Sequence, residues 1–422
     1  MSEWPVAELG DHVDMQVGFP FKSAKFLDQS KHAVRLLRGD NIGQGLLRWD
    51  GAKHWPKAEV EAVTSYHVDQ GDVILAMDRP WIEAGLKFAY VRPSDMPCLL
   101  VQRVTRMRGT ATLETDYLRH VIASPAFTGY IKSITTGVNV PHISGKDIKK
   151  FRFPLPPLET QRRIASILGV YDDLIEVNRR RIAVLEEMAR GLFEEWFVRF
   201  RFPGHEAVPI LDTQDGPLPE GWTWDRIGDV AAYVNRGIAP KYDDEAETLV
   251  IGQKCIRDQR LSLVLARKQS KNVPIEKVVQ PGDVLINSTG TGTLGRVAQA
   301  EQVLPGLTVD SHVTIVRPNL PEDRDYLGLS LFAMQPVFEH LGAGSTNQTE
   351  LARSAVQSQM LVWAPVDLRA RFGLMVRPMR ELAEQLAQQN STLAASRDLL
   401  LPRLISGQLS VAEAERELEE AA

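Results

Sequence analysis

Cysteine is almost absent from this sequence. Its 422 residues include two cysteines, Cys98 and Cys255, which stand more than 150 positions apart. A disulfide framework and a cysteine-based zinc site both need more cysteines at closer spacing. The sequence therefore excludes a small disulfide-stapled protein and favours a reducing compartment.

Long apolar runs are also lacking. No run approaches the roughly 18 residues that a membrane-spanning helix requires, and the opening residues MSEWPVAELG have no apolar core of a signal peptide. Hydrophobic residues nevertheless make up 44% of the chain and charged residues 24%, which is enough for well-packed cores. We expect a soluble, cytoplasmic protein that makes no contact with membranes.

The familiar motifs of catalysis are missing too. The chain has no Asn-Pro-Pro-Tyr methyltransferase tetrapeptide, no Gly-x-Ser-x-Gly, no phosphate-binding Walker loop and no His-Glu-x-x-His. Its nine histidines are scattered without the spacing of metal ligands. We therefore predict that this chain has no catalytic residues, no metal site and no cofactor of its own.

One glycine-rich segment needs separate consideration. Gly290 to Gly295 reads GTGTLG and follows a strand-like run, as a dinucleotide-binding loop would. Such a loop must open a helix whose N-terminus holds the pyrophosphate. The residues that follow are interrupted by Pro305 before a crossover helix could form. A flexible loop is the favoured interpretation, and a nucleotide site is the alternative.

An excess of positive charge, the usual mark of a duplex-binding protein, is absent. The net charge is −5. Lysine and arginine exceed the acids by three in residues 1–155, whereas the acids are in excess by six in residues 206–365. Phosphate neutralisation supplies much of the affinity for DNA. If this chain binds DNA, we expect a partner to share the phosphate contacts.

The sequence does contain an internal repeat. Leu9-Gly-Asp recurs as Ile227-Gly-Asp, and QGDVILA ending at Ala76 recurs as QPGDVLIN ending at Asn287. VQRVTR and SHVTIV follow in the same order, as do the pairs Tyr-Leu that begin at 117 and 326. An ordered series at one offset of about 210 residues indicates a duplication.

Each copy consists of a mixed α/β region followed by a long helical tract. Short β-rich runs bounded by Gly, Pro and Asp predict the first kind of region, and proline-poor heptads predict the second. Pro378 lies about ten residues inside the second tract, so that helix either starts near it or bends there. The predicted segments are 1–155 (first α/β domain), 156–203 (first long helix), 204–365 (second α/β domain), 366–410 (second long helix) and 411–422 (acidic tail).

The heptads predict that the two helices pair with each other. In an antiparallel pair they would form a coiled-coil spacer between two α/β domains, in an α+β fold. A polar Asn at matching places in both tracts would set the register. In the alternative, each helix packs only on its own domain. The predicted seam contains Ile164, Ile167, Leu174, Asn178 and Leu185 in the first helix, and Met379, Leu382, Leu386, Asn390 and Leu393 in the second.

Three strings carry a resemblance to a known family. PLPPLETQRRIASIL, ending at Leu168, and LEEMARGLFEEWF, ending at Phe197, resemble the first conserved helix of type I restriction–modification specificity subunits. LLLPRLISGQL, ending at Leu409, is similar to the end of their second helix. The second copy departs from the pattern, because it has WAPVDLRARF from Trp363 in place of PPLETQ.

The resemblance implies a function. Two target-recognition domains would each bind one half of a bipartite site in double-stranded DNA, and the helices would set the gap between the halves. The partners would be two methyltransferase subunits, which bind S-adenosylmethionine and modify adenine, and restriction subunits that use ATP and Mg²⁺ for translocation and cleavage.

Candidate DNA contacts are polar, cationic or aromatic side chains in loops, because these side chains bind phosphates and base edges. Each of them has an alternative interpretation as an ordinary solvated loop residue. The candidates are Lys22, Arg38, Arg79, Trp81, Lys132, Thr135, Thr136 and Asn139 in the first copy, and Arg236, Lys241, Lys254, Ser288, Thr289, Thr291 and Asn347 in the second.

Two other functions remain open at the level of sequence. The acidic balance favours a coiled-coil adaptor that binds no DNA. The chain could also be the recognition subunit of a related system in which one partner both cuts and methylates.

Overall fold

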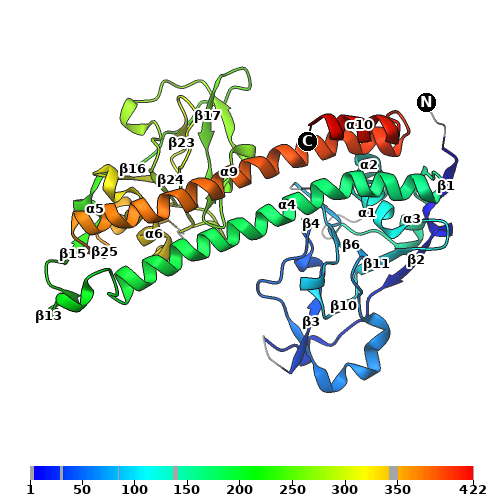
Figure 1. Cartoon of the computed structure of the whole chain (residues 1–422), viewed down its shortest axis with the longest axis horizontal. Coiled ribbons are helices and arrows are strands. Elements are labelled where there is room, and N and C mark those ends of the chain that lie inside the picture. The colour runs from blue at the N-terminus through cyan, green and yellow to red at the C-terminus, as the bar shows by residue number, and fades with distance from the viewer. Residues whose placement is uncertain (1–3, 29–31, 84, 136–140, 342–349, 422) are drawn as a thin grey trace. The chain divides into compact units, whose positions relative to one another are not determined.

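The computed structural model describes residues 4–28, 32–83, 85–135, 141–341 and 350–421, the side chains of the last five residues excepted. The chain forms two compact units. Unit 1 comprises Met1–Val177 together with Gln389–Ala422, and unit 2 comprises Asn178–Gln388. Each unit therefore contains one α/β region and one part of both long helices (Figure 1).

Unit 1 contains a five-stranded sheet in the order β2-β11-β6-β9-β4 and a three-stranded sheet in the order β10-β3-β5. Strand β1 pairs with β12, and β7 forms a hairpin with β8. The strands are β1 (Val6–Glu8), β2 (Val13–Val17), β3 (Ala33–Leu37), β4 (Gln44–Gly45), β5 (His54–Pro56), β6 (Val73–Ala76), β7 (Trp81–Ile82), β8 (Gly85–Leu86), β9 (Phe88–Tyr90), β10 (Cys98–Leu100), β11 (Val104–Gly109) and β12 (Arg152–Pro154).

Unit 2 contains a four-stranded sheet in the order β16-β24-β21-β22 and a three-stranded sheet in the order β20-β17-β23. Strand β15 pairs with β25, and β13–β14 and β18–β19 are hairpins. The strands are β13 (Ile210–Thr213), β14 (Gly216–Pro219), β15 (Thr223–Arg226), β16 (Ala231–Arg236), β17 (Thr248–Ile251), β18 (Ile256–Arg257), β19 (Arg260–Leu261), β20 (Arg267–Gln269), β21 (Val284–Asn287), β22 (Val297–Gln299), β23 (Thr308–Val309), β24 (Val313–Pro318) and β25 (Met360–Trp363).

The two units repeat one topology, which confirms the duplication. The order β2-β11-β6-β9 corresponds to β16-β24-β21-β22, with antiparallel pairing at each step. In the smaller sheets, β3 and β17 are each central, with one parallel and one antiparallel neighbour. The closing pairs β1–β12 and β15–β25 also match. Mixed sheets with helices at one side make each copy an α/β unit, as predicted.

Short helices cover the sheets and tie them to the closing strands. The tyrosines at matching places, Tyr117 and Tyr326, are buried, and their hydroxyls donate to the carbonyls of Pro154 and Val362. Each therefore links a helix to the strand that precedes a long helix. The short helices are α1 (Thr115–Ala123), α2 (Pro125–Ile134) and α3 (Gly145–Lys149) in unit 1, and α5 (Ile227–Val230), α6 (Arg324–Ala333), α7 (Gln335–Leu341) and α8 (Arg353–Gln357) in unit 2.

The long helices have slightly different bounds from those predicted. Helix α4 runs over Leu158–Phe193 and ends in a π-helical turn, Glu194–Val198. Helix α9 runs unbroken over Val366–Ile405, so it does not start at Pro378. Pro378 has no backbone N–H, so the helical hydrogen bond to the carbonyl of Leu374 is missing. Both residues are exposed, and water can satisfy that carbonyl.

The segment predicted as an acidic tail is helical. Helix α10 occupies Val411–Ala421, and the Ser410 hydroxyl caps it by accepting from the backbone N–H of Glu413. Val411 and Ala414 are buried in the core of unit 1, and Glu415 pairs with Arg163 of α4 at 2.5 Å. The end of the chain therefore packs against its first long helix.

The long helices are antiparallel within each unit. In unit 2, Phe193 packs against Phe372 and Ile182 against Leu386, so rising numbers in α4 meet falling numbers in α9. In unit 1, a core shared by the first turns of α4 and the last turns of α9 repeats this direction, and an ion pair of 2.5 Å joins Asp172 to Arg397. The predicted pairing of the two helices is thus present in both units.

The residues of the predicted seam differ in their burial. Ile164, Asn178 and Leu386 are buried, and Leu185, Met379, Asn390 and Leu393 are half-buried. Ile167 is also buried, and like Ile164 it lies in a core that residues of the first α/β region and the end of α9 share. Leu174 and Leu382 are 46% and 45% exposed, so their assignment to the seam was wrong.

The row that packs lies one residue later. It contains Ile175, Ile182 and Ala189 in α4, and Val376 and Ala383 in α9. A shift of one residue turns a side chain by about 100° around a helix. Apolar residues occur on both sides of the seam, and the heptad pattern alone did not distinguish them.

Each α/β region is also attached to the helices by arginine–carboxylate pairs. In unit 1, Arg92 pairs with Glu176 at 2.5 Å and Arg119 with Asp172 at 3.4 Å. In unit 2, Arg369 of α9 pairs with Asp323 at 2.7 Å in a site where both side chains are buried. The helices therefore pack both on each other and on their own domains, so the two alternatives of the sequence coexist.

Candidate nucleic-acid interface

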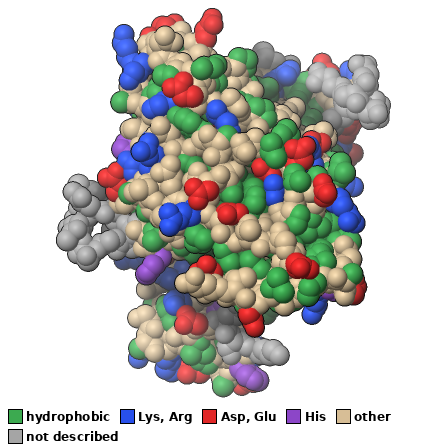
Figure 2. All heavy atoms as spheres, turned by 90° about the vertical axis from the view of Figure 1, so that its left-hand side faces the viewer, with side chains coloured by type: hydrophobic (Ala, Val, Ile, Leu, Met, Phe, Trp, Pro, Cys, Tyr) green, Lys and Arg blue, Asp and Glu red, His purple; other side chains and the backbone are tan. Residues whose placement is uncertain are grey.

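Cationic and acidic side chains alternate over the surface in Figure 2, and hydrophobic side chains lie between them. This pattern agrees with the small net charge of the chain. Several of the predicted contact residues lie in the loops after two equivalent central strands, β6 and β21.

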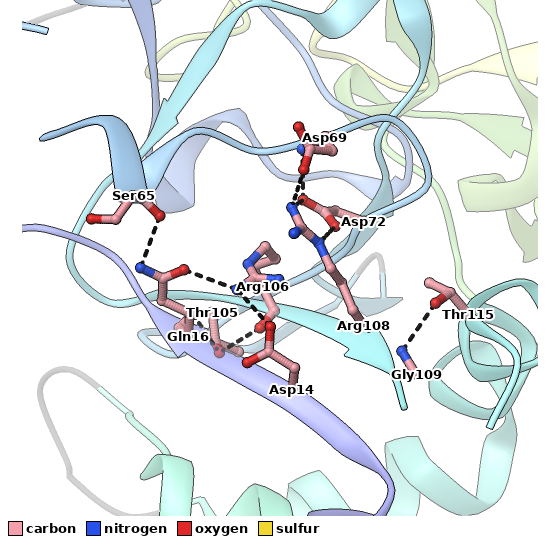
Figure 3. Close-up of polar contacts among 10 residues, drawn as sticks. All are labelled: Asp14, Gln16, Ser65, Asp69, Asp72, Thr105, Arg106, Arg108, Gly109 and Thr115. Carbon is pink, nitrogen blue, oxygen red and sulfur yellow. Dashed lines mark hydrogen bonds and ion pairs between the residues drawn. The ribbon is translucent and has the colours of Figure 1, made fainter. Parts of the chain in front are cut away.

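Each central strand begins at an aspartate–arginine ion pair, and the two pairs are equivalent. In unit 1, Asp72 precedes β6 and accepts from the guanidinium of Arg108 at the end of β11 (Figure 3). In unit 2, Asp283 and Arg317 repeat this pair at 2.8 Å. Each carboxylate also accepts a backbone N–H three residues earlier, in a turn closed by a glycine with φ above 90°. The recurring Gly-Asp motif is therefore structural, and it sets the direction of the strand.

A buried arginine lies beside that pair in unit 1. Arg106 on β11 is 7% exposed and donates to Asp14 and Gln16 of β2, both at 2.9 Å (Figure 3). The matching position in unit 2 is Ile315, which is fully buried. The first copy therefore has a buried arginine where the second has an apolar side chain.

The loop after β6 brings three predicted residues of unit 1 close together. Trp81 is 39% exposed, and the Lys132 ammonium of α2 lies 4.1 Å from the centre of its ring. Arg79 is exposed, with its backbone in the left-handed region at φ 44° and its N–H donating to Pro141. Thr135 ends α2, and its hydroxyl donates to the carbonyl of Ile131.

The loop after β21 is organised differently. Ser288 is fully buried and its hydroxyl bonds that of Thr314 at 2.6 Å, so it is not available for a DNA contact. Thr289 is half-buried and bonds the His312 ring at 2.9 Å and the Gln253 amide. Thr291 is exposed.

In each unit, the loop after the central strand forms a β-bridge with an equivalent segment. Asp78 forms an isolated bridge with His142, and Thr289 forms one with Glu350. This loop therefore contacts the segment that follows two short helices, which are α1 and α2 in unit 1 and α6 and α7 in unit 2. Thr136, Asn139 and Asn347 were predicted in the adjoining stretches and lie outside the described residues.

The early basic residues do not form one group. Lys22, Lys241 and Lys254 are exposed. Arg38 pairs with Asp40 at 3.3 Å, and its guanidinium lies 5.9 Å from the ring centre of Phe26.

Arg236 is used internally. It pairs with Glu350 and donates to the carbonyl of Leu351 at 2.9 Å, so it supports the loop after β21 rather than presenting a cation.

Sequence reasoning missed Gln253 and His312, which complete the polar cluster around Thr289. His312 lies in the repeated SHVTIV string, which was the available signal. Burial raises the pKa of the neighbouring Asp310, whose carboxylate accepts the N–H of His312. In unit 1, burial, together with the charge of Arg79, lowers the pKa of Lys87, and the charges of Asp40 and Asp78 oppose that shift.

The glycine loop has the geometry of a turn. Gly290, Gly292 and Gly295 all have positive φ, and strand β22 follows where a dinucleotide site would need a helix. Among the described residues no group of His, Cys, Asp or Glu is arranged to hold a metal. In the same part of the chain no helix is long and apolar enough to cross a membrane.

Comparison with known proteins gives a consistent family. The family model described as Type I restriction modification DNA specificity domain matches residues 1–187. Over 310 residues the chain is 25% identical to the Type I restriction enzyme MjaIX specificity subunit of Methanocaldococcus jannaschii, which covers 71% of this chain and 70% of that protein. Over 176 residues it is 36% identical to the EcoAI specificity subunit of Escherichia coli, which covers 41% of this chain and 28% of that protein.

A solved structure shares the fold. The crystal structure of the type I restriction–modification system S subunit from M. genitalium superposes with a TM-score of 0.56 at 13% identity, over 95% of this chain and 96% of that chain. The fold of this chain is therefore that of the S subunit of a type I system. Its residues 1–187 match a type I restriction modification DNA specificity domain, and the relatives that it resembles are specificity subunits of type I restriction enzymes.

Proposed function

We propose that this chain binds a bipartite sequence in double-stranded DNA as the specificity subunit of a type I restriction–modification complex. Each unit would bind one half-site through the loops after its central strand. The observation that carries the proposal is the duplication itself. Two units share one topology and the same Asp–Arg support, yet they present different side chains at the equivalent loops.

The chain would supply recognition without catalysis. S-adenosylmethionine, ATP and Mg²⁺ would bind to the partner subunits, which methylate adenine and translocate or cut DNA in the cytoplasm. The mixed charge of this chain agrees with a division of labour in which those partners hold most of the phosphates.

The long helices offer a surface for these partners. Helix α4 exposes apolar side chains at heptad spacing on the side that precedes the seam row, and α9 does the same. In an antiparallel pair these two sides lie together. The exposed apolar residues are Val170, Leu174, Val177, Val184 and Met188 of α4, and Val366, Leu374, Met375, Leu382 and Leu399 of α9.

An apolar row of this kind fits a helix of a methyltransferase subunit. Changing Leu174→Glu and Val177→Glu should weaken assembly with that subunit by at least tenfold, because two charges would be buried in the interface. Val264→Glu is the matched control, since Val264 is 88% exposed in another part of the chain. If calorimetry shows that the wild type, the double variant and the Val264→Glu control assemble equally well, this surface does not contact the methyltransferase subunit.

The DNA proposal is tested by footprinting the chain reconstituted with its methyltransferase partner. We expect two short protected blocks around an unprotected gap, and methylome sequencing of the host with and without the gene should give the same bipartite target. One continuous footprint would contradict the two-unit arrangement. A shift that is independent of sequence would favour a coiled-coil adaptor. Methylation and cleavage by one fused partner would indicate the related system.

A further inference from the structure

Strand β7 presents two neighbouring apolar side chains to solvent. Trp81 and Ile82 are 39% and 40% exposed. Both residues adjoin buried neighbours. The N–H of Lys87 donates to Pro80 at 2.7 Å, Pro80 is buried, and Leu86, which pairs with Trp81 in the hairpin, is buried in the core of unit 1.

The surroundings of this pair are cationic. The Lys132 ammonium lies 4.1 Å from the ring centre of Trp81, and Arg79 is exposed two residues before it. Among the described residues no carboxylate pairs with Lys132 or Arg79. Of the acids near them in sequence, Asp78 is paired with Arg103 at 2.9 Å, and Glu83 is exposed.

An exposed apolar pair flanked by cations fits one class of ligand better than a protein or a membrane. DNA-binding proteins that deform the duplex insert apolar side chains between base pairs, while nearby cations hold the phosphates. The same loop is a candidate DNA contact on independent grounds, because it follows the central strand of the unit.

We infer that Trp81 and Ile82 form a wedge that enters between two base pairs of the half-site bound by unit 1. The inference rests on the proposed function and adds to it a mode of recognition. The wedge unstacks one base step, and the cost of unstacking depends on that step, so the half-site is selected partly by deformability. Lys132 holds the ring in place and contacts the backbone of the opened step.

The equivalent loop of the second unit, which follows β21, has no such pair among its described residues. It presents Thr289 and Thr291 with Gly290 between them, and the side chain of Thr289 is already bonded to His312 and Gln253. The two half-sites are therefore treated differently. The first is distorted and the second is not.

The experiment uses the full chain in complex with its methyltransferase partner and its own target duplex. 2-Aminopurine is placed in turn at each position of both half-sites. Its fluorescence rises when its neighbour is unstacked. We expect a rise at one step of the first half-site, and none in the second. Trp81→Ala should abolish the rise and weaken binding by about tenfold or more, as the loss of one stacking contact does.

Matched variants separate the parts of the inference. Trp81→Phe should keep most of the fluorescence rise, and Lys132→Gln should weaken binding while leaving it detectable. Val264→Ala, which shortens an apolar side chain of greater exposure, should behave as the wild type.

Three results would overturn the wedge. The first is a complex with Trp81→Ala that binds and unstacks the target as the wild type does, which leaves the proposed function intact. The second is a failure of Trp81→Ala to assemble with the methyltransferase when DNA is absent, which would make the pair a protein contact. The third is a wild-type complex without sequence-specific binding, which would also refute the proposed function.

Discussion

The equivalent carboxylates Asp72 and Asp283 differ in how deeply their arginines are buried. Arg317 is 13% exposed and Arg108 is 34% exposed. Burial raises the pKa of Asp283, and the hydrogen bonds from Arg317 oppose that shift. A buried charge that loses its partner is costly, whereas a solvated one is not. The aspartate–arginine pair should therefore contribute more to the stability of unit 2 than to that of unit 1.

Asp283→Asn should lower the unfolding free energy of unit 2 by about 3 kcal/mol, because Arg317 stays buried without a counter-charge. Asp72→Asn should cost unit 1 less. Asp28→Asn, which removes an exposed pair with Lys53, should leave stability nearly unchanged. Hydrogen exchange resolved by peptide reports each unit separately. Equal effects of all three changes would show that burial does not determine the cost.

His120 of α1 adds a pH dependence to unit 1. It is buried beside Arg119, whose Nε donates to it at 3.1 Å. Burial, followed by the charges of Arg119 and Arg397, holds its pKa well below 6.5. The folded unit therefore contains a neutral imidazole. The unfolded chain takes up a proton below about pH 6.5, so stability present above that pH is lost as the pH falls.

Between pH 7 and pH 5 the protection of residues 115–123 against hydrogen exchange should fall, by up to about 1.4 kcal/mol per pH unit. His120→Gln keeps a hydrogen-bond acceptor and should flatten that slope. Peptides of unit 2 provide the internal comparison, because burial raises the pKa of its carboxylates Asp283, Asp310 and Asp325. Those groups add stability as the pH falls. A variant with the same slope as the wild type would mean that other groups titrate.

At the scale of elements, the long helices carry two different faces. One contains the seam and the contacts to the α/β regions, and the other is apolar but exposed. If the helices set the gap between half-sites, their length must be changed in both at once. A change in α4 alone would shift its seam row against α9.

Removing one heptad from each helix, residues 179–185 and 383–389, should keep the seam in phase and shorten the spacer by about 10 Å. We expect the unread gap to shrink by up to about three base pairs, with both half-sites unchanged. Methylome sequencing of cells that carry the variant measures both. Removing 179–185 alone is the control and should impair folding. New half-sites in the double deletion would refute the idea of a ruler.

At the scale of the whole molecule, the duplication extends into the helices. With an offset of 212 residues, Ala189 and Phe193 of α4 correspond to Leu401 and Ile405 of α9, and all four are buried. The second half of α4 therefore resembles the part of α9 that completes the core of unit 1. In a chain that lacks α9, the second half of α4 from another copy can therefore take the place of the missing end of α9.

A fragment of residues 1–205 should dimerise, because the second half of α4 from one copy can cover the core of the other. Light scattering should give twice the fragment mass, and with the methyltransferase the dimer should bind a palindrome of the first half-site. Phe193→Glu should return the fragment to a monomer. A wild-type fragment that is monomeric and inactive would contradict the substitution.

The sequence by itself determined the large-scale organisation. The ordered repeat predicted two units of one topology, since matching Gly-Asp turns and tyrosines serve the same structural roles in both copies. The heptads predicted two long antiparallel helices, because an apolar stripe of that length needs a partner. The family-like strings identified the class of protein, and the failed motif searches led to the prediction of a chain without catalysis.

Only the tertiary structure decided which side chains are available and which are used internally. Loop position made Ser288 and Arg236 equal candidates to Trp81, but the fold buries the first, pairs the second with Glu350 and leaves the third exposed. Local spacing likewise placed Leu174 in the seam, although the row one residue later packs. Burial depends on residues that lie far apart in the sequence, and periodicity within one segment contains no information about them.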